Sequence, residues 1–261
     1  MFIAPSYQKL LELNGLDKFD EVWTAEAEWI EVPNSDRGGW SGVSRLYLAL
    51  PEGGEIMAYL KRQQNHIRPS LRHPISGEAT FAREFSIIRR LEQHGVPSLK
   101  PMLFATTKQN GKWRAMLMTE ELAGYQSLEE LMMNGAVEAM TLHEKRRLLA
   151  AVADLVRRMH AAGVQHRSLY AKHLFVQREG NGYKVAIIDL EKSRVSLMPL
   201  LSMLSDLISL NYRTGNWSKT HRLFFYRHYC GDRKLNAWDK LCLRYIIARS
   251  YKKRLKAKGN A

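Results

Sequence analysis

Cysteine is scarce in this sequence, which has two thiols, Cys230 and Cys242, among 261 residues. Two thiols cannot build the disulfide framework of a small secreted protein, and neither lies in a metal-binding CxxC spacing, so a reducing cytoplasm is the expected compartment. Long apolar runs are missing as well. The most apolar stretch, residues 195–210, contains Pro199 and Asp206 and is shorter than the roughly 20 residues that span a bilayer. Any membrane association is therefore expected to be peripheral.

Acidic residues are also in short supply, because 26 Asp and Glu stand against 40 Lys and Arg and leave a net charge of +14. Such an excess attracts polyanions, namely nucleic acid, anionic lipid or phosphorylated glycans, although part of it can be ordinary solvated surface. The densest basic run, residues 249–258, is a candidate contact for a membrane surface or a nucleic acid. Hydrophobic residues make up 45% of the chain, which is typical of a globular protein with one large domain or two tightly joined lobes.

The first third of the chain has the pattern of antiparallel strands, because short apolar or alternating runs are separated by Gly, Pro and Asn. These runs are Trp29–Val32, Ser44–Leu50 and Ile56–Leu60. The connection between the first two carries Gly38, Gly39 and Gly42. Glycines let backbone N–H groups approach phosphates, so this segment is a candidate nucleotide-binding loop. It does not match GxGxxG, and a plain hairpin turn explains it equally well.

A lysine and a glutamate in this region are candidates for an ion pair beside a nucleotide. Lys61 ends the strand Met57–Lys61, where its ammonium could reach nucleotide phosphates. Glu84 lies in the predicted helix Glu78–His94, whose apolar residues have helical spacing and which Gly95 terminates. Glu84 is therefore a candidate partner for Lys61. The alternative is that both are surface residues, as most Lys and Glu are.

The middle of the chain indicates a division into two parts. A strand is predicted at Trp113–Met118, and Glu120–Gly124 follows as a crossover, with Glu120 itself a candidate nucleotide contact. We therefore expect a β-rich, nucleotide-binding part with one long helix over residues 1–122. Residues 123–261 are expected to form a larger, mostly helical part with a basic tail.

The second part opens with a long helix that starts at Thr141, where Thr-Leu-His-Glu has capping-box spacing, and that ends near Gly163. Two short strands are predicted after it, at Leu174–Val176 and Val185–Leu190. Residues 200–258 are mostly helical by pattern. The candidate catalytic segment lies between this long helix and the pair of short strands.

That segment contains His166-Arg167-Ser168-Leu169-Tyr170-Ala171-Lys172-His173, which lies between the long helix and the first of these strands. A lone His-Arg pair is usually structural, but a capped helix before it and a strand after it are typical of a kinase catalytic loop. His166, Arg167 and Ser168 are therefore candidate catalytic residues.

Asp189 closes the second of these strands and is a candidate catalytic and metal-binding residue. A carboxylate at a strand end is what Mg²⁺ on nucleotide phosphates requires, and the alternative is an Asp that caps the next turn. His173 would take the second metal-side position. Because imidazole is a poor ligand for Mg²⁺, the alternative is that His173 holds the loop or a phosphate.

Phosphoryl transfer needs a cover over the phosphates, a cation on them, metal-binding oxygens and a group that orients the attacking hydroxyl. Candidates for each occur here in that order along the chain. The expected fold is therefore α+β and protein-kinase-like, with a small β-rich N-terminal lobe and a larger helical C-terminal lobe.

These motifs resemble those of the lipopolysaccharide kinase family of the Kdo kinase and WaaP type, and most closely its InaA-like branch. The most specific pieces are residues 166–176 and 188–190, with Tyr after the loop leucine, His where other kinases have Asn, and Asp-Leu in place of Asp-Phe-Gly. Arg83-Glu84-Phe85 and Gly95-Val96-Pro97 resemble the family's first long helix and its end. The resemblance runs from about Trp23 to Tyr229.

The resemblance implies ATP and Mg²⁺ as co-substrates and a Kdo or heptose sugar of the lipopolysaccharide inner core as acceptor. It also implies work at the cytoplasmic face of the inner membrane, on an anionic surface. For single residues it implies an ATP-phosphate contact for Lys61, its ion pair for Glu84 and metal binding for Asp189. Asp206 would be an acid that supports the loop.

Ser168 departs from the family pattern, because the family's sugar kinases have a catalytic Asp at this place. A serine cannot accept a proton at neutral pH, and general-base assistance typically contributes about 10²- to 10⁴-fold. Transfer through a loose transition state depends mainly on positioning and charge, so a slow or rerouted kinase remains an option, with Glu191 as a substitute base.

Three hypotheses follow from the sequence. The first is an ATP-dependent sugar kinase of the lipopolysaccharide core. The second is a catalytically impaired nucleotide-binding protein with a regulatory or envelope-stress role, which Ser168 suggests. The third is a nucleic-acid-associated protein, which only the basic tail suggests.

Overall fold

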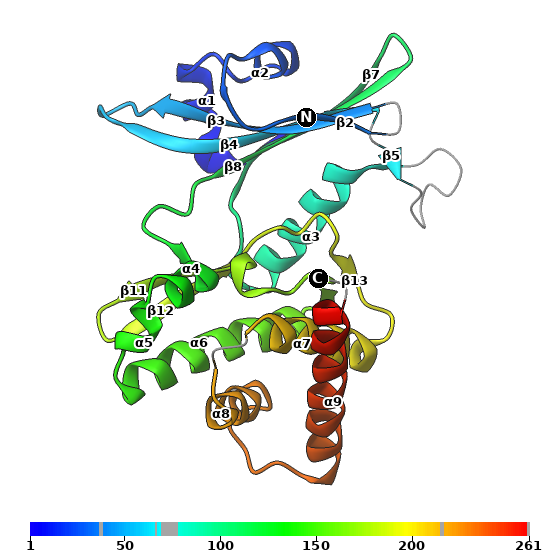
Figure 1. Cartoon of the computed structure of the whole chain (residues 1–261). Coiled ribbons are helices and arrows are strands. Elements are labelled where there is room, and N and C mark those ends of the chain that lie inside the picture. Colours follow the sequence, from blue (N-terminus) through cyan, green and yellow to red (C-terminus); the bar gives the residue numbers. More distant parts are fainter. Residues whose placement is uncertain (37–38, 66, 69–77, 215–216, 260–261) are drawn as a thin grey trace. The chain divides into compact units, whose positions relative to one another are not determined.

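The computed structural model describes residues 1–36, 39–65, 67–68, 78–214 and 217–259 (Figure 1). The chain forms two compact units. The first comprises Met1–Arg89 and Leu99–Ala123, and the second comprises Arg90–Ser98 and Gly124–Ala261. The sequence predicted that the second part begins at residue 123. The second unit continues from Gly124, one residue later.

The first unit is built on a six-stranded antiparallel sheet with the order β1-β7-β8-β4-β3-β2. Its strands are β1 (Phe2–Ile3), β2 (Glu28–Asp36), β3 (Gly39–Ala49), β4 (Glu55–Gln64), β7 (Pro101–Gln109) and β8 (Lys112–Glu120). The strands predicted in the first third of the chain correspond to β2, β3 and β4, and each is longer than predicted. Strands β1 and β7 were not predicted from the sequence.

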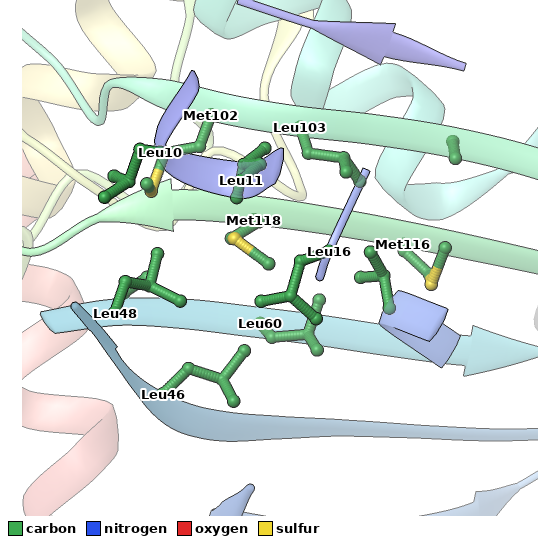
Figure 2. Close-up of a cluster of buried hydrophobic side chains, with 13 residues drawn as sticks. Leu10, Leu11, Leu16, Leu46, Leu48, Leu60, Met102, Leu103, Met116 and Met118 are labelled. Carbon is green, nitrogen blue, oxygen red and sulfur yellow. The ribbon is translucent and has the colours of Figure 1, made fainter. Parts of the chain in front are cut away.

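The core of the first unit lies where two short N-terminal helices pack on the sheet. Helices α1 (Gln8–Leu13) and α2 (Phe19–Thr24) follow the 3₁₀ turn η1 (Pro5–Tyr7) and bury Leu10, Leu11 and Val22. Figure 2 shows leucines and methionines of β3, β4, β7 and β8 gathered around these helices. Each fully buried side chain of this kind stabilises the fold by roughly 1.5–3 kcal/mol. The cluster therefore fixes the central strand β4.

Helix α3 (Thr80–Gln93) follows a two-stranded pair, β5 (Ile67–Arg68) and β6 (Glu78–Ala79). The helix begins two residues later than predicted, because residues 78 and 79 pair as a strand. Its residues up to Arg89 belong to the first unit and the remainder to the second.

The second unit is mostly helical and centres on α6 (Leu142–Ala161). The Thr141 side chain accepts a hydrogen bond from the Glu144 backbone N–H, and the Glu144 side chain accepts one from the Thr141 N–H, which confirms the predicted capping box. The buried residues of α6 form one stripe along the helix: Leu148, Leu149, Val152, Ala153, Leu155, Val156 and Met159. Helix α8 and strand β12 pack on α6.

The other helices of the second unit are α4 (Leu128–Met133), α5 (Ala136–Ala139), α7 (Pro199–Arg213), α8 (Lys219–Tyr229) and α9 (Ala237–Gly259), with a 3₁₀ turn η2 (Ala171–His173). A three-stranded sheet combines β9 (Gln126–Ser127), β11 (Leu174–Glu179) and β12 (Gly182–Ile187), and β10 (Val164–Gln165) pairs with β13 (Arg194–Val195). A β-rich first unit and a helical second unit confirm the predicted α+β class. Within the described ranges, every helix is too short or too polar to span a bilayer.

Candidate active site

Lys61 and Glu84 form an ion pair in the first unit, with Lys61 Nζ 2.7 Å from Glu84 Oε1. Leu60 points into the core, so the alternation along β4 directs Lys61 to the other face of the sheet. Helix α3 lies on that face, since Phe85 stacks on Phe104 with ring centroids 4.4 Å apart. The ion pair predicted from the sequence is therefore present.

This ion pair is largely buried. The Glu84 side chain is fully buried and the Lys61 side chain is 19% exposed. The second oxygen of Glu84, Oε2, is buried and has no hydrogen-bond partner among the described residues. A buried carboxylate is costly unless a cation lies against it, so Glu84 requires Lys61 at this place. The arrangement supplies a positioned ammonium on β4.

Of the three candidate phosphate-loop glycines, Gly38 falls outside the described residues, and Gly39 and Gly42 lie in β3 where it pairs with β2. A Cβ on Gly39 would lie 2.5 Å from the backbone oxygen of Gln64. A Cβ on Gly42 would lie 2.7 Å from Cζ3 of Trp29. Sheet packing thus explains why residues 39 and 42 are glycines. Their contact with a nucleotide stays a prediction.

Glu120 ends strand β8 and ties the N-terminal segment to the sheet. Its Oε2 accepts a hydrogen bond from the Tyr7 hydroxyl and another from Lys100 Nζ at 3.2 Å. These contacts occupy the side chain within the first unit. A nucleotide contact by Glu120 stays a prediction.

In the second unit, Asp206 holds the loop that begins at His166. Its carboxylate is fully buried in α7. Oδ2 accepts the backbone N–H of His166 at 2.7 Å, and Oδ1 accepts that of Arg167 at 2.8 Å. The Arg167 side chain is exposed, and its backbone is left-handed with φ 67°. One carboxylate therefore fixes two successive peptide groups of the candidate catalytic loop.

His160 and Tyr229 extend this network from α6 and α8. His160 Nε2 lies 3.2 Å from Asp206 Oδ2, and Nδ1 lies 2.8 Å from the Tyr229 hydroxyl. An imidazole that donates from Nε2 and accepts the tyrosine proton at Nδ1 satisfies both contacts. Burial raises the pKa of Tyr229, which keeps that proton in place. Neither residue was predicted; the available signal was that His160 follows Met159 of the buried α6 stripe.

His166 links the loop to the end of β12. Its ring is fully buried, Nε2 donates to the Ile188 carbonyl at 3.0 Å, and Nδ1 accepts the Ser168 N–H at 3.3 Å. Burial lowers the pKa of His166, because a charged imidazolium loses its hydration there. A neutral His166 with its proton on Nε2 fits every one of these contacts.

His173 lies between Ser168 and Asp189. Its Nδ1 is 2.8 Å from the Ser168 carbonyl oxygen, and its Nε2 is 3.1 Å from Asp189 Oδ2. The His173 ring stacks on that of His166, with centroids 5.6 Å apart. Burial lowers the pKa of His173, and the Ser168 carbonyl and the Asp189 carboxylate oppose this. The structure thus brings His166, Ser168, His173 and Asp189 into one cluster.

Asp189 leaves strand β12 through a left-handed backbone with φ 57°. The strand ends at Ile187, so the predicted end at Leu190 is wrong. The Asp189 side chain is 38% exposed, and a carboxylate that reaches solvent can bind a divalent cation. In the part of the chain that the structure describes, no three His, Cys, Asp or Glu side chains form a metal cluster. Asp189 and His173 are a pair, and Glu191 lies in the turn that follows.

The fold is that of a kinase-like protein. The family model of the lipopolysaccharide kinase (Kdo/WaaP) family matches residues 20–229, so the chain belongs to this family. The resemblance predicted from the sequence is confirmed.

Individual relatives agree with this assignment. The chain is 36% identical to protein InaA of Escherichia coli K12 over 178 residues, which cover 68% of this chain and 79% of InaA. It is 32% identical to the lipopolysaccharide core heptose(I) kinase WaaP of the same strain over 217 residues, which cover 80% of this chain and 78% of WaaP. A solved structure of WaaP in complex with acyl carrier protein superposes with a TM-score of 0.71 at 22% identity, over 98% of both chains. The predicted kinase-like fold is therefore confirmed.

Proposed function

We propose that this chain is an ATP-dependent kinase that phosphorylates a Kdo or heptose sugar of the lipopolysaccharide inner core. The observation that carries the proposal is the buried ion pair between Lys61 and Glu84. A fully buried Glu is rare unless it is paired, and the ammonium that this pair holds in place is the kind of group that nucleotide phosphates require. The acceptor class is taken from the WaaP relative, a lipopolysaccharide core heptose(I) kinase.

Among the described residues, Lys61, Glu84 and Asp189 fit contacts to ATP and Mg²⁺, whereas His173 does not. Lys61 would contact the phosphates, with Glu84 holding its ammonium in place, and the half-exposed carboxylate of Asp189 would bind the metal. His173 fits a metal poorly, because imidazole is a weak ligand for Mg²⁺ and its Nδ1 is engaged by Ser168. We assign His173 to holding the loop and Asp189. Bound Mg²⁺ supplies charge neutralisation on the phosphates.

Ser168 determines how fast such a kinase can be. The residue is 8% exposed, and its backbone is held by His166 and His173. A hydroxyl there can hydrogen-bond an acceptor sugar but cannot take its proton at neutral pH. We therefore propose slow transfer that relies on positioning and on charge neutralisation.

The second candidate function is nucleotide binding with little or no turnover, in a regulatory or envelope-stress role. This second function is favoured because residue 168 is a serine and has no carboxylate to act as a base. The candidate nucleotide and metal contacts of Lys61, Glu84 and Asp189 do not require a carboxylate at that position. Binding of ATP without transfer to any sugar is its expected signature.

We also propose that the protein works peripherally at the cytoplasmic face of the inner membrane, where a lipopolysaccharide precursor with a sugar core would be presented. The net charge of +14 supports attraction to an anionic surface.

The test is acceptor-dependent ATP consumption with defined Kdo- and heptose-containing oligosaccharides in the presence of Mg²⁺. We expect slow transfer by the wild type and none by Asp189→Ala. Ser168→Asp should raise turnover by about 10²- to 10⁴-fold. Asp154→Asn, which changes an exposed carboxylate of α6, is the matched control and should leave the rate unchanged.

Failure of both the wild type and Ser168→Asp to phosphorylate any such acceptor would sink the kinase proposal. If Mg²⁺-ATP still binds under those conditions, the second candidate takes its place.

A further inference from the structure

Helices α7 and α9 of the second unit pack against each other (Figure 1) and leave a groove along their contact, which we call the α7/α9 groove. On one side it is lined by apolar side chains of α7, namely Leu201, Leu204 and Ile208. On the other side it is lined by cations of α9, among them Lys252, Lys253 and Lys256. The groove therefore has an apolar wall and a basic wall.

The basic wall is a continuous stripe. Arg249, Lys252, Lys253 and Lys256 are exposed and fall three or four residues apart, so they share one face of α9. Residues 240–261 contain eight Lys or Arg and no Asp or Glu. Among the described residues, none of the four cations lies in an ion pair; Lys253 sits over the Tyr212 ring at 5.0 Å instead. The stripe is electrostatically unneutralised.

The apolar wall reaches solvent. Leu201 is 53% exposed, and the two residues that precede α7, Leu197 and Met198, are 84% and 61% exposed. Large apolar side chains that cluster at the surface indicate an interaction site. Tyr245 also lines the groove, and tyrosine favours the boundary between an apolar phase and water.

Cations beside exposed leucines match an anionic amphiphile better than a purely polar anion. Nucleic acid would neutralise the stripe but would leave Leu197, Met198 and Leu201 in water. A bilayer with anionic lipids satisfies both walls, because phosphates meet the cations while the leucines enter the headgroup region.

We propose that the α7/α9 groove is the surface by which this protein binds a bilayer that contains anionic lipid. The inference rests on the proposed function for its biological setting, since a glycolipid acceptor lies in a membrane. The binding itself requires neither ATP nor lipopolysaccharide, so it can be tested without catalysis.

The experiment is flotation of the full chain with vesicles of phosphatidylcholine and 30% phosphatidylglycerol, with pure phosphatidylcholine vesicles as reference. The wild type should bind the anionic vesicles and not the neutral ones. A Lys or Arg near an anionic surface strengthens binding by about fivefold. The triple variant Lys252→Gln, Lys253→Gln, Lys256→Gln should therefore bind about 100-fold more weakly.

A charge-matched control separates this surface from net charge. The variant Lys9→Gln, Lys108→Gln, Lys112→Gln removes three exposed lysines of the first unit and should bind within about twofold of the wild type. A third variant, Leu197→Gln with Leu201→Gln, should abolish the part of the binding that survives 500 mM salt, since screening removes only the electrostatic part.

Equal loss of binding in the control variant, or equal binding to neutral vesicles, would overturn the proposal. So would tighter binding to a single-stranded RNA than to vesicles when the same three groove lysines account for it. Failure of the sugar kinase assay leaves these results unaffected, because the vesicles contain no acceptor.

Discussion

Asp206 is the residue on which the loop geometry depends most directly. Its carboxylate accepts the N–H groups of His166 and Arg167, and His160 braces it from α6. Removing the acceptor of a buried hydrogen bond costs more free energy than the bond contributes on folding. The donor that remains is then without water and without a partner. Stability and loop geometry are therefore linked through one side chain.

We expect Asp206→Ala to lower the free energy of unfolding by about 2–5 kcal/mol, since it leaves two backbone N–H groups and His160 without their acceptor. Urea unfolding followed by circular dichroism measures this change. Asp154→Ala on the exposed side of α6 is the control and should cost no more than about 0.5 kcal/mol. Equal effects of the two substitutions would contradict the role given to Asp206.

Residue types at the site were predictable because kinase chemistry constrains them at fixed places along the chain. Lys61, Glu84, His166 and Asp189 are each of a type suited to phosphate, ion-pair, loop or metal contacts. Their partners were less predictable. The family resemblance indicated Asp206 as an acid that supports the loop, but it did not name the groups that Asp206 contacts. These are two backbone N–H groups about 40 positions away, and backbone donors carry no sequence signal.

The buried histidines predict a pH dependence of stability. An unfolded histidine binds a proton near pH 6.5, whereas burial lowers the pKa of both His166 and His173 in the fold. The unfolded chain therefore binds more protons as the pH falls through 6.5. Stability should be full above about pH 7 and should decrease toward pH 5, by at most about 1.4 kcal/mol per pH unit for each histidine.

Urea unfolding at a series of pH values measures this slope. His166→Gln keeps a donor for the Ile188 carbonyl and removes one titrating group, so its slope should be shallower than that of the wild type. Stability that is constant or rising toward pH 5 would refute the assignment of a neutral His166.

At the scale of elements, Gly42 in the β2–β3 hairpin is a residue for which sheet packing and nucleotide binding would both require glycine. Gly42 lies in β3 against the Trp29 ring, and a Cβ would also lie 3.1 Å from the Glu31 carbonyl oxygen. The glycine is required by the sheet whether or not a nucleotide lies nearby.

Gly42→Ala should destabilise the protein by about 1–3 kcal/mol, because the added methyl group overlaps Trp29. Gly182→Ala in β12 is the control: its Cβ would meet only the Glu179 carbonyl oxygen at 3.7 Å, an ordinary contact, so stability should hold or improve. Thermal unfolding compares the two. Unchanged stability of Gly42→Ala together with weaker ATP binding would instead assign this glycine to the nucleotide.

Elements with a regular apolar pattern were predictable, and elements without one were not. In the sequence, helix α6 is indicated by a capping box and by a full apolar stripe. Helices α1 and α2 have only six residues each, and their packing on the sheet holds them in place. Strand β7 begins at Pro101 and turns polar toward Gln109, so its alternation is incomplete. Its strand character comes from pairing with β8, which sequence periodicity does not reveal.

At the scale of the whole molecule, the candidate residues are distributed over two compact units. Lys61 and Glu84 belong to the first, and the catalytic loop with Asp189 belongs to the second. Each unit holds its own set of contacts, so damage to one set leaves the other intact. If the proposed function is correct, substitution of Lys61 should act mainly on nucleotide binding, and substitution of Ser168 should act mainly on phosphoryl transfer.

Mg²⁺-ATP should stabilise the folded chain, by about 2.7 kcal/mol at a concentration 100-fold above its Kd, because only the fold binds it. Lys61→Met should lose most of this stabilisation. Lys18→Met, in which the lost ammonium forms an exposed ion pair with Glu21, should keep it. Differential scanning fluorimetry with and without Mg²⁺-ATP checks both. An equal response of the two variants would show that Lys61 does not contact the nucleotide.

Arg167 in the candidate catalytic loop and Asp189 after β12 both have a left-handed backbone. Glycine occupies that conformation without strain, whereas an ordinary side chain costs about 1 kcal/mol there. The chain would thus be more relaxed with glycine at both positions. Folding alone does not explain two charged side chains at those places. A search for stabilising substitutions would find these sites attractive, and each such gain would remove a charge from the loop.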